Sequence, residues 1–446
     1  MEFINDYRVE EYVLSTCWED FPDEVKKRIK MCGLDLITAL ILGCHSRQFK
    51  TGEKIANTYG LSGDIAIIGS IHRYNLLGAT MAMGHSCNSF DIDDGHRTIC
   101  GHPGTSFVAG VLAASYLKNL SLKEYLTTLG ICYEITIRWA LAMQKEYNYL
   151  HSTGTYGAFG TALGIGRILG FNKEQLNNAL SIADYHAPMT PVMRAVEYPS
   201  MNKDGVPFGA LIGTMAVLET IYGSTGKTHI LEMPQYSKHL DDLGKKYHIL
   251  DLYFKPYTCC RWAHQSIRAC LHLRQQYHFS LDDISHITIH TFRAATRLSK
   301  AIPQNTDEAQ YNIAYPIACA LVYGDVGYEQ IKDDNLHNPQ VIEIMHKMTF
   351  ITEQSLEDLF PQQRLAYVEI IKIDGKRLKS NIFEAEGEPE DPELNINWIG
   401  NKFKRLTNTM IKHQEQEDII NIFNNLNKMS VRQLVSQINN AIKIEL

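Results

Sequence analysis

The sequence lacks the patterns that mark several protein classes. Its ten cysteines form no CxxC pair, a spacing that does not suit a zinc or iron–sulfur site, so we expect mostly buried thiols. No apolar run is long enough to span a membrane, and the acidic first residues lack the pattern of a signal peptide. The chain has no basic block and a net charge of −7, which argues against nucleic acid or an anionic membrane as a partner. We therefore expect a cytoplasmic protein.

Nucleotide and metal motifs are incomplete as well. The stretch GSTGKT at 223–228 has Ile221 where a Walker loop needs a glycine five residues before Gly226. The glycine-rich segment that begins at His151 has the wrong glycine pattern for a dinucleotide site, and no strand precedes it. The run that begins at Asp91 has its glycine one position too early for a calcium loop. A single metal held by Asp and His side chains stays an alternative.

Helical spacing dominates the first half of the chain. With 446 residues and 45% hydrophobic residues, the chain can form one large and one small domain. Apolar residues recur with helical spacing over 22–45, and small residues favour another helix over 65–85. Ser121 stands three residues before Glu124 at the start of a long helix, as a capping residue does. Up to residue 250 we find no convincing alternating strand, so this half is predicted to be all-α.

The pattern changes after Cys260. The stretches ISHITIHTF and LAYVEIIKI alternate or are rich in β-branched residues, and Asp374-Gly375 is typical of a hairpin turn. An acidic connector follows, and the tail from Ile396 is helical again. We predict a mainly α protein whose large all-helical domain comprises 1–265 plus 396–446. Residues 266–395 form the inserted smaller α+β domain.

The segment 91–104, DIDDGHRTICGHPG, concentrates the groups that could carry chemistry. Glycines and a proline interrupt any regular helix through it. A surface acidic loop is the plain interpretation. A catalytic loop is the alternative, because histidine titrates near neutral pH and neighbouring carboxylates can orient it. The groups concerned are Asp91, Asp93, Asp94, His96 and His102.

Five segments in order complete a wider pattern. They are DIDDGH with its HPG turn, HSTGTYGAFG at 151, MNKDGVPFGA at 201, KPYTCCRWAH at 255 and AQYNIAYPIA at 309. Together they resemble the MmgE/PrpD family, which includes 2-methylcitrate dehydratase, cis-aconitate decarboxylase and iminodisuccinate epimerase. The resemblance implies a large helical domain formed by both chain ends, a smaller lid, and a cytosolic homodimer. It also implies small substrates with two or three carboxylates, and neither a metal nor an organic cofactor.

The resemblance also implies residue roles. The residues expected in catalysis are Asp91, His102, His151, Lys203 and Tyr315, with Lys203 meeting a substrate carboxylate and Tyr315 projecting from the lid. The residues expected to bind substrate are Asp94, His96, Arg261 and His264, and it stays open whether Cys260, Arg261 or His264 faces the substrate. Gly95 departs from the threonine common in the dehydratase and the decarboxylase, which affects the substrate more than the chemistry.

The shared chemistry is proton transfer at a carbon next to a carboxylate. It requires a positioned base and a cationic environment for the developing charge, which histidine, lysine and arginine supply. Loss of hydroxide then gives dehydration, loss of carbon dioxide gives decarboxylation, and reprotonation on the other face gives epimerisation. We expect a lyase, foremost a 2-methylcitrate dehydratase-like hydro-lyase. An epimerase, a decarboxylase, a non-catalytic carboxylate-binding protein and a metallohydrolase are the alternatives.

Overall fold

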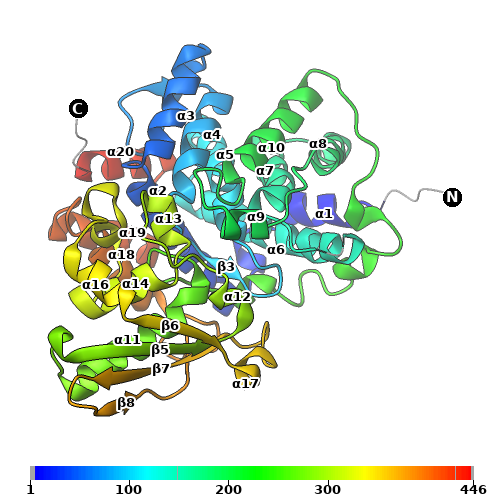
Figure 1. Cartoon of the computed structure of the whole chain (residues 1–446). Helices are drawn as coiled ribbons and strands as arrows, with labels where there is room; N and C mark the ends of the chain where they lie inside the picture. Colours follow the sequence, from blue (N-terminus) through cyan, green and yellow to red (C-terminus); the bar gives the residue numbers. More distant parts are fainter. Residues whose placement is uncertain (1–5, 148, 427, 443–446) are drawn as a thin grey trace.

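Helices make up most of this protein, as the apolar periodicity predicts. The computed structural model describes residues 6–147, 149–426 and 428–442. The chain is 58% helical with 10% strand, which confirms a mainly α fold. Figure 1 shows the helices of the first half above a sheet that lies at the bottom of the molecule.

The helices of the first half pack closely on one another. α5 is buried from Pro103 to Tyr116, as expected of a helix that is apolar on all sides. α7 packs against both α5 and α10, and Figure 1 shows these helices beside α4. Ser121 caps α6, its hydroxyl accepting from the Glu124 amide at 3.2 Å. The helices are α1 (Arg8–Ser15), α2 (Asp23–Gly43), α3 (Arg47–Thr58), α4 (Leu76–Cys87), α5 (Pro103–Lys118), α6 (Leu122–Glu146), α7 (Thr153–Leu169), α8 (Lys173–Tyr185), α9 (Met193–Glu197) and α10 (Val206–Ile221).

Two short sheets in this half correct the all-α prediction. β1 (Ser62–Ala66) pairs antiparallel with β2 (Arg73–Tyr74), so the helix predicted over 65–85 begins only at Leu76. β3 (Gly95–His96) pairs antiparallel with β4 (Leu252–Tyr253), which joins the acidic segment to a distant part of the chain. These strands have two to five residues, too few for a period-two pattern to stand out.

A five-stranded sheet occupies the segment that alternates in sequence. β5 (Ile284–Thr291) lies parallel to β6 (Met348–Thr352) and antiparallel to β7 (Leu365–Lys372), which also pairs with β8 (Arg377–Lys379) and β9 (Phe383–Glu384). The predicted hairpin turn joins β7 to β8, with Gly375 at a φ of 84°. Around the sheet lie α11 (His264–Tyr277), α12 (Arg293–Thr296), α13 (Thr306–Gln310), α14 (Ala314–Tyr323), α15 (Tyr328–Ile331), α16 (Pro339–His346) and α17 (Gln354–Glu357).

The C-terminal helices return to the first half. α18 (Ile396–Thr407) and α19 (His413–Asn425) pack on α2, while α20 (Val431–Ala441) contacts α5 and α6. Lys402 on α18 donates to Asp35 of α2 at 2.5 Å within the core. The strands β5–β9 lie inside 266–395, and the exact domain boundaries stay a prediction. Short 3-10 helices complete the chain: η1 (Trp18–Asp20), η2 (Ile230–Glu232), η3 (Ser237–Leu240), η4 (His248–Asp251), η5 (Arg261–Ala263), η6 (Leu281–Asp283) and η7 (Asp333–Asn335).

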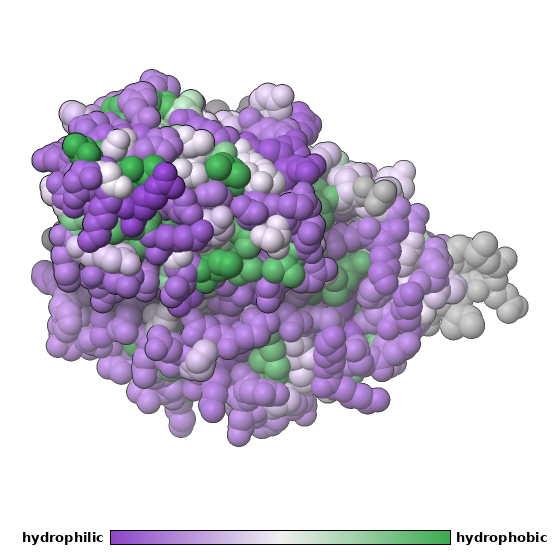
Figure 2. Space-filling model, turned by 60° about the horizontal axis from the view of Figure 1, so that its bottom comes forward, coloured by the Kyte–Doolittle hydropathy of each residue, from purple (hydrophilic) through white to green (hydrophobic). Residues whose placement is uncertain are grey.

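The surface is mostly hydrophilic on the face shown in Figure 2, and hydrophobic residues gather there mainly along a furrow across its middle. Within the described ranges, no single helix is long and apolar enough to cross a membrane. The consecutive helices α2 and α3 together have the length and apolar composition of a membrane span, but the chain bends by 80° at their junction.

Candidate active site

The acidic segment is buried, which rules out a surface loop. Asp91, Asp93, Asp94 and His96 are at most 3% exposed, and His102 is 9% exposed. Groups of this kind are buried only where partners compensate them. The segment runs from the end of α4 to Pro103, the first residue of α5, so His102 stands at the N-cap of a core helix.

Three buried lysines hold the backbone of this loop. Lys203 donates to the carbonyl oxygens of residues 88 and 89, at 3.0 Å for the first. Lys255 donates to the Asp91 carbonyl at 2.9 Å, and Lys402 donates to the Ile92 carbonyl at 2.7 Å. The lysines come from three distant parts of the chain. Ammonium groups make strong bonds to carbonyl oxygens, so the loop is fixed from several sides.

The imidazole of His102 has a defined orientation. Its Nδ1 lies 2.6 Å from the Asp94 carbonyl oxygen, which can only accept, so Nδ1 carries the proton. Its Nε2 points to two carboxylates, 3.7 Å from Asp91 Oδ1 and 3.5 Å from Asp204 Oδ2. The loop therefore presents Nε2, the nitrogen free to exchange a proton, beside Asp91 and Asp204.

A small cavity opens at this point. Tyr311 also faces it, its hydroxyl 3.4 Å from Asp204 Oδ1. Three cationic side chains stand against two carboxylates in its wall, an arrangement that suits an anionic ligand. The lining residues are Asp91, Cys100, His102, Val192, Val196, Asp204, Tyr253, Lys255, Cys260, Arg261, Trp262, Tyr311 and Arg364.

The two carboxylates differ in their electrostatic environment. Burial would raise the pKa of Asp91, but the charge of Lys255, whose Nζ lies 2.6 Å from Asp91 Oδ1, holds that pKa below its ordinary value. Burial raises the pKa of Asp204, which has no lysine at such a distance. Asp91 is therefore the ionised partner, and Asp204 more readily holds a proton. Paired groups whose pKa values diverge are typical of acid–base sites.

Tyr253 organises the cationic side of the cavity. Its ring lies 4.6 Å from the guanidinium carbon of Arg261 and 5.4 Å from that of Arg364. A Cβ at Gly95 would lie 2.3 Å from the Tyr253 ring, so only glycine leaves room for this tyrosine. Glu388 balances Arg261 at 2.8 Å. The glycine that departs from the family pattern thus has a physical reason in the same site.

The structure brings three of the predicted site residues to the cavity: Asp91, His102 and Arg261. Cys260 lines it as well, and burial raises the pKa of that thiol to about 12, so it is not a thiolate at neutral pH. His264 lies behind, its Nε2 donating to the Cys259 carbonyl at 3.0 Å. The sequence left open whether Cys260, Arg261 or His264 faces the substrate, and in the structure Cys260 and Arg261 line the cavity.

Asp94 and Lys203 act from behind the cavity. Asp94 accepts from the Gly104 amide at 3.3 Å and from Tyr133, and burial raises its pKa to about 7. The Lys203 ammonium also donates to Gln310, and Lys203 lines an adjoining hollow but not this cavity. Its predicted contact with a substrate carboxylate stays a prediction.

His96, His151 and Tyr315 do not line the cavity either. The Tyr315 hydroxyl donates to the Gln330 carbonyl at 2.8 Å. The His151 ring lies 4.3 Å from the Tyr149 ring, and within the described part of the chain its nitrogens have no hydrogen-bond partner. His96 points to Asp251, at 3.9 Å from Nε2. Their predicted roles in the reaction stay untested predictions.

Several cavity residues escaped sequence reasoning. Three of them, Asp204, Lys255 and Tyr311, stand inside segments of the family pattern, in which the sequence predicts neighbouring residues as the site. Adjacent positions on a loop or helix direct their side chains differently, so the sequence pattern alone does not show which of two neighbours faces the cavity. Arg364 begins a strand-like stretch, and Tyr253 lies in a two-residue strand. Neither carried a signal in the sequence.

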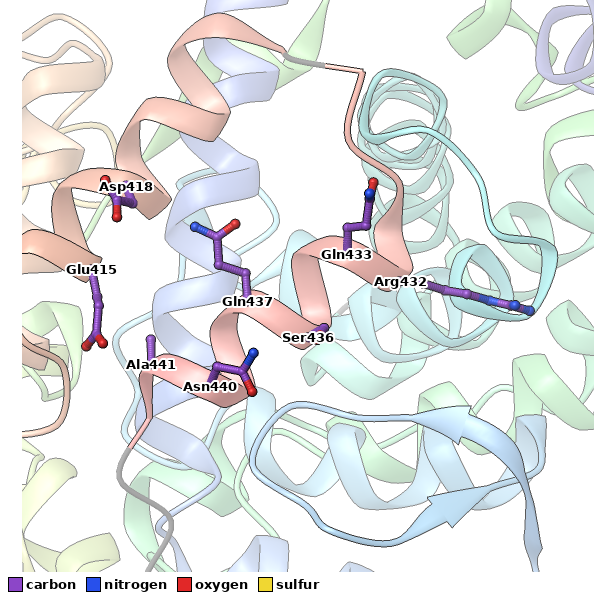
Figure 3. Close-up of a pocket in the computed structure, with 8 residues that line it drawn as sticks. All are labelled: Glu415, Asp418, Arg432, Gln433, Ser436, Gln437, Asn440 and Ala441. Carbon is purple, nitrogen blue, oxygen red and sulfur yellow. The ribbon is translucent and has the colours of Figure 1, made fainter.

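Three other hollows lie elsewhere on the described surface, and the one beside α3 has His45 and His72 in its wall. Another adjoins the cavity and includes Arg194, Lys203 and Phe208, and α9 separates the two, because Val192 and Val196 face the cavity while Arg194 faces the hollow. The third lies between α19 and α20. Figure 3 shows the residues that line it, two acidic ones on α19 and the others on α20: Glu415, Asp418, Arg432, Gln433, Ser436, Gln437, Asn440 and Ala441. This hollow contains no histidine, so it lacks the imidazole that the cavity at His102 offers for proton transfer.

Among the residues that the structure describes, three groups of side chains bring metal-binding atoms within 4.8 Å of one another. One is Asp91, His102 and Asp204 in the cavity, where the ammonium of Lys255 already provides a positive charge beside Asp91. The others are Glu10, His229 and Glu232, which are all buried, and a group in which His96 is buried while His248 and Asp251 reach the surface.

A buried imidazole between carboxylates, facing cationic side chains across a small cavity, defines a site for acid–base chemistry on a small anion. The chain belongs to the MmgE/PrpD family: the N-terminal domain of that family matches residues 8–238 and the C-terminal domain matches residues 257–428. This confirms the resemblance read from the five segments.

Two fungal relatives illustrate the similarity. The cis-aconitate decarboxylase-like protein oryM of Aspergillus oryzae is 23% identical over 448 residues, which covers 90% of both chains. A cis-aconitate decarboxylase of Aspergillus terreus is 23% identical over 366 residues, covering 74% of this chain and 75% of its own. The family includes dehydratases and decarboxylases, so the comparisons support a lyase-like role.

Proposed function

We propose that this protein is a lyase that acts on a small di- or tricarboxylic acid by removing a proton next to a carboxylate. The observation that carries the proposal is His102, whose Nδ1–H is fixed by the Asp94 carbonyl so that Nε2 faces the cavity. Lys255, Arg261 and Arg364 supply the positive charge that substrate carboxylates and a developing carbanion need.

The foremost candidate reaction is dehydration of a 2-methylcitrate-like hydroxy acid. His102 Nε2 takes the proton from carbon, a carbon–carbon double bond forms, and the carbon–oxygen bond breaks. Asp204, whose pKa burial raises, gives its proton to the leaving hydroxide, and water departs. The two groups lie 3.5 Å apart, so the proton on His102 can return to Asp204 and reset the site.

Decarboxylation of cis-aconitate is the second candidate, because both relatives carry that activity in their names. In this reaction the cations hold the remaining carboxylates while carbon dioxide leaves, and His102 or Asp204 protonates the resulting carbanion. An epimerase would use the same groups for removal and return of one proton.

A substrate panel separates these reactions. Purified protein is incubated with 2-methylcitrate, citrate, other hydroxy acids and cis-aconitate. Dehydration is followed by the ultraviolet absorbance of the new conjugated double bond, decarboxylation by carbon dioxide release, and epimerisation by deuterium exchange without net product. The His102→Asn variant controls for contaminating enzymes. Ligand-induced thermal stabilisation with neither turnover nor exchange would instead identify a non-catalytic carboxylate-binding protein.

We also propose that residues 266–395 act as a lid. Tyr311 and Arg364 come from this segment, whereas Asp91, His102 and Lys255 come from the helical part, so closing the two together completes the cavity. Substrate should therefore lower the rate of hydrogen exchange in both parts. Exchange that is unchanged by a turned-over substrate would argue against closure.

A homodimer is the proposed assembly, and α10 offers a surface for it. Phe208 and Met215 on α10 and Tyr222 at its C-cap follow at seven-residue spacing, so they share one face, and they are 58%, 40% and 86% exposed. A second copy of this chain is the expected partner. Analytical ultracentrifugation should give a dimer for the unmodified chain and a monomer for Phe208→Asp.

A further inference from the structure

A second constellation of ligating side chains lies beside the loop that carries His102. His96 is in β3, which pairs with β4 so that His96 stands opposite Leu252. His248 and Asp251 belong to η4, directly before β4. Residues three apart in a 3-10 helix lie on one side, so η4 directs both side chains toward His96.

The distances match those of a tetrahedral metal site. His248 Nδ1 lies 3.2 Å from Asp251 Oδ2, and His96 Nε2 lies 3.9 Å from the same oxygen. Zinc bonds to nitrogen and oxygen at about 2.0–2.2 Å, which places tetrahedral ligands roughly 3.3–3.6 Å apart. All three ligand atoms lie within 4.8 Å of one another, so small side-chain adjustments bring them to one ion.

His96 is an independent sign of a missing partner. It is 3% exposed, and among the residues that the structure describes its Nε2 is buried without a hydrogen-bond partner. Such groups are rare in folded proteins, because an unsatisfied buried polar atom is destabilising. The Ile99 amide donates to Nδ1 over 3.4 Å, which favours the tautomer with the proton on Nε2. This contact is long and therefore weak, so a cation bound at Nε2 can displace that proton to Nδ1 at the cost of one poor hydrogen bond.

The surroundings give an ion access and a suitable charge. The side chain of Asp251 is 54% exposed, so the site opens to solvent on that side. The constellation offers one carboxylate and two imidazoles, ligand types that zinc takes in proteins. Arg28, which donates to the Leu252 carbonyl at 2.6 Å, and Arg364 are nearby cations that lower the affinity.

We propose that His96, His248 and Asp251 bind one zinc-class divalent cation, which ties the loop 91–102 to η4 and β4. Three protein ligands leave the fourth position to water. The ion stabilises the strand pair β3–β4, whose Gly95 and Tyr253 lie in contact at the cavity wall. This site is separate from the cavity at His102, and the inference does not depend on the proposed reaction.

The test uses the full-length protein without a histidine tag, freed of metal by chelation. We expect zinc to raise the melting temperature in a saturable manner, and calorimetry to give one ion per chain. Cobalt in place of zinc should give the visible absorbance of a tetrahedral site. Removing a ligand should weaken binding at least about tenfold. His248→Gln and Asp251→Asn suit this purpose because both positions reach the surface.

His413→Gln is the matched control. His413 is an exposed histidine 3.6 Å from the carboxylate of Glu417, so the substitution removes a histidine–acid pair elsewhere. This variant should bind zinc and cobalt as the unmodified protein does. Failure of the unmodified protein to bind either ion would overturn the proposal, and so would equal binding by the His248 and Asp251 variants.

Discussion

Replacing His102 by asparagine isolates the half of the imidazole that faces the cavity. The asparagine side-chain amide is attached to the same Cγ that carries Nδ1 in histidine, so it can keep the bond to the Asp94 carbonyl. The substitution removes Nε2, which lies beside Asp91 and Asp204. An amide cannot take up a proton at neutral pH, whereas an imidazole can.

We expect turnover to fall by about 10²–10⁴, the contribution of a positioned acid or base. The free energy of unfolding should change by no more than about 1 kcal/mol, because one hydrogen bond is kept and the removed atoms border a cavity. The rate is measured on the substrate found in the panel, at saturation, and stability by thermal and denaturant unfolding of the same preparation.

The His102→Gln variant is the control for position. Its amide reaches toward the place of Nε2 but titrates no more than asparagine does, so it should be as slow as His102→Asn. Recovery of turnover by glutamine would mean that hydrogen bonding, not proton transfer, is needed there. A variant that unfolds easily yet keeps normal turnover per folded molecule would show that His102 is structural, and the assignment would be refuted.

Four further substitutions test the surroundings. Lys255→Met leaves the buried Asp91 carboxylate without its cation and should lower the free energy of unfolding by about 3–5 kcal/mol, measured with denaturant; a change below about 1 kcal/mol would contradict this pairing. Because burial raises the pKa of Asp94 to about 7, above its unfolded value, folding takes up a proton; this stabilisation is complete below about pH 4 and is lost as pH rises through 7. Asp94→Asn should remove this pH dependence, at most about 4 kcal/mol, and an unchanged pH profile would be evidence against it. Tyr311→Phe should slow turnover by about tenfold or more while Tyr315→Phe does not, and the reverse order would place Tyr315 at the site.

The sequence predicts the fold class well because long helices carry strong periodic signals. The helix over 22–45, the hairpin at Asp374-Gly375 and the alternating strands β5 and β7 all follow from local patterns. The short strands β1–β4 do not, because two to five residues show no periodicity and their partners are distant. Gly95 pairs with Tyr253, which is distant in the sequence, so no local sequence pattern predicts this pairing.

The site was located in part for a similar reason. The composition of the acidic segment is unusual, so the sequence alone predicts Asp91 and His102 as candidate site residues, and both line the cavity. The direction of a side chain depends on tertiary contacts, however, and Lys203 illustrates this. Its ammonium donates to the carbonyl oxygens of residues 88 and 89, whereas the next residue, Asp204, lines the cavity. The sequence does not predict Lys255 as a site residue, because its contact with Asp91 exists only in the folded structure.

A crystal structure with a bound di- or tricarboxylate tests the central claim most directly. The account predicts carboxylates beside Lys255, Arg261 and Arg364, and a substrate carbon within hydrogen-bonding reach of His102 Nε2. A ligand bound instead in the hollow at Arg194, or between α19 and α20, with the cavity at His102 free of it, would contradict the account.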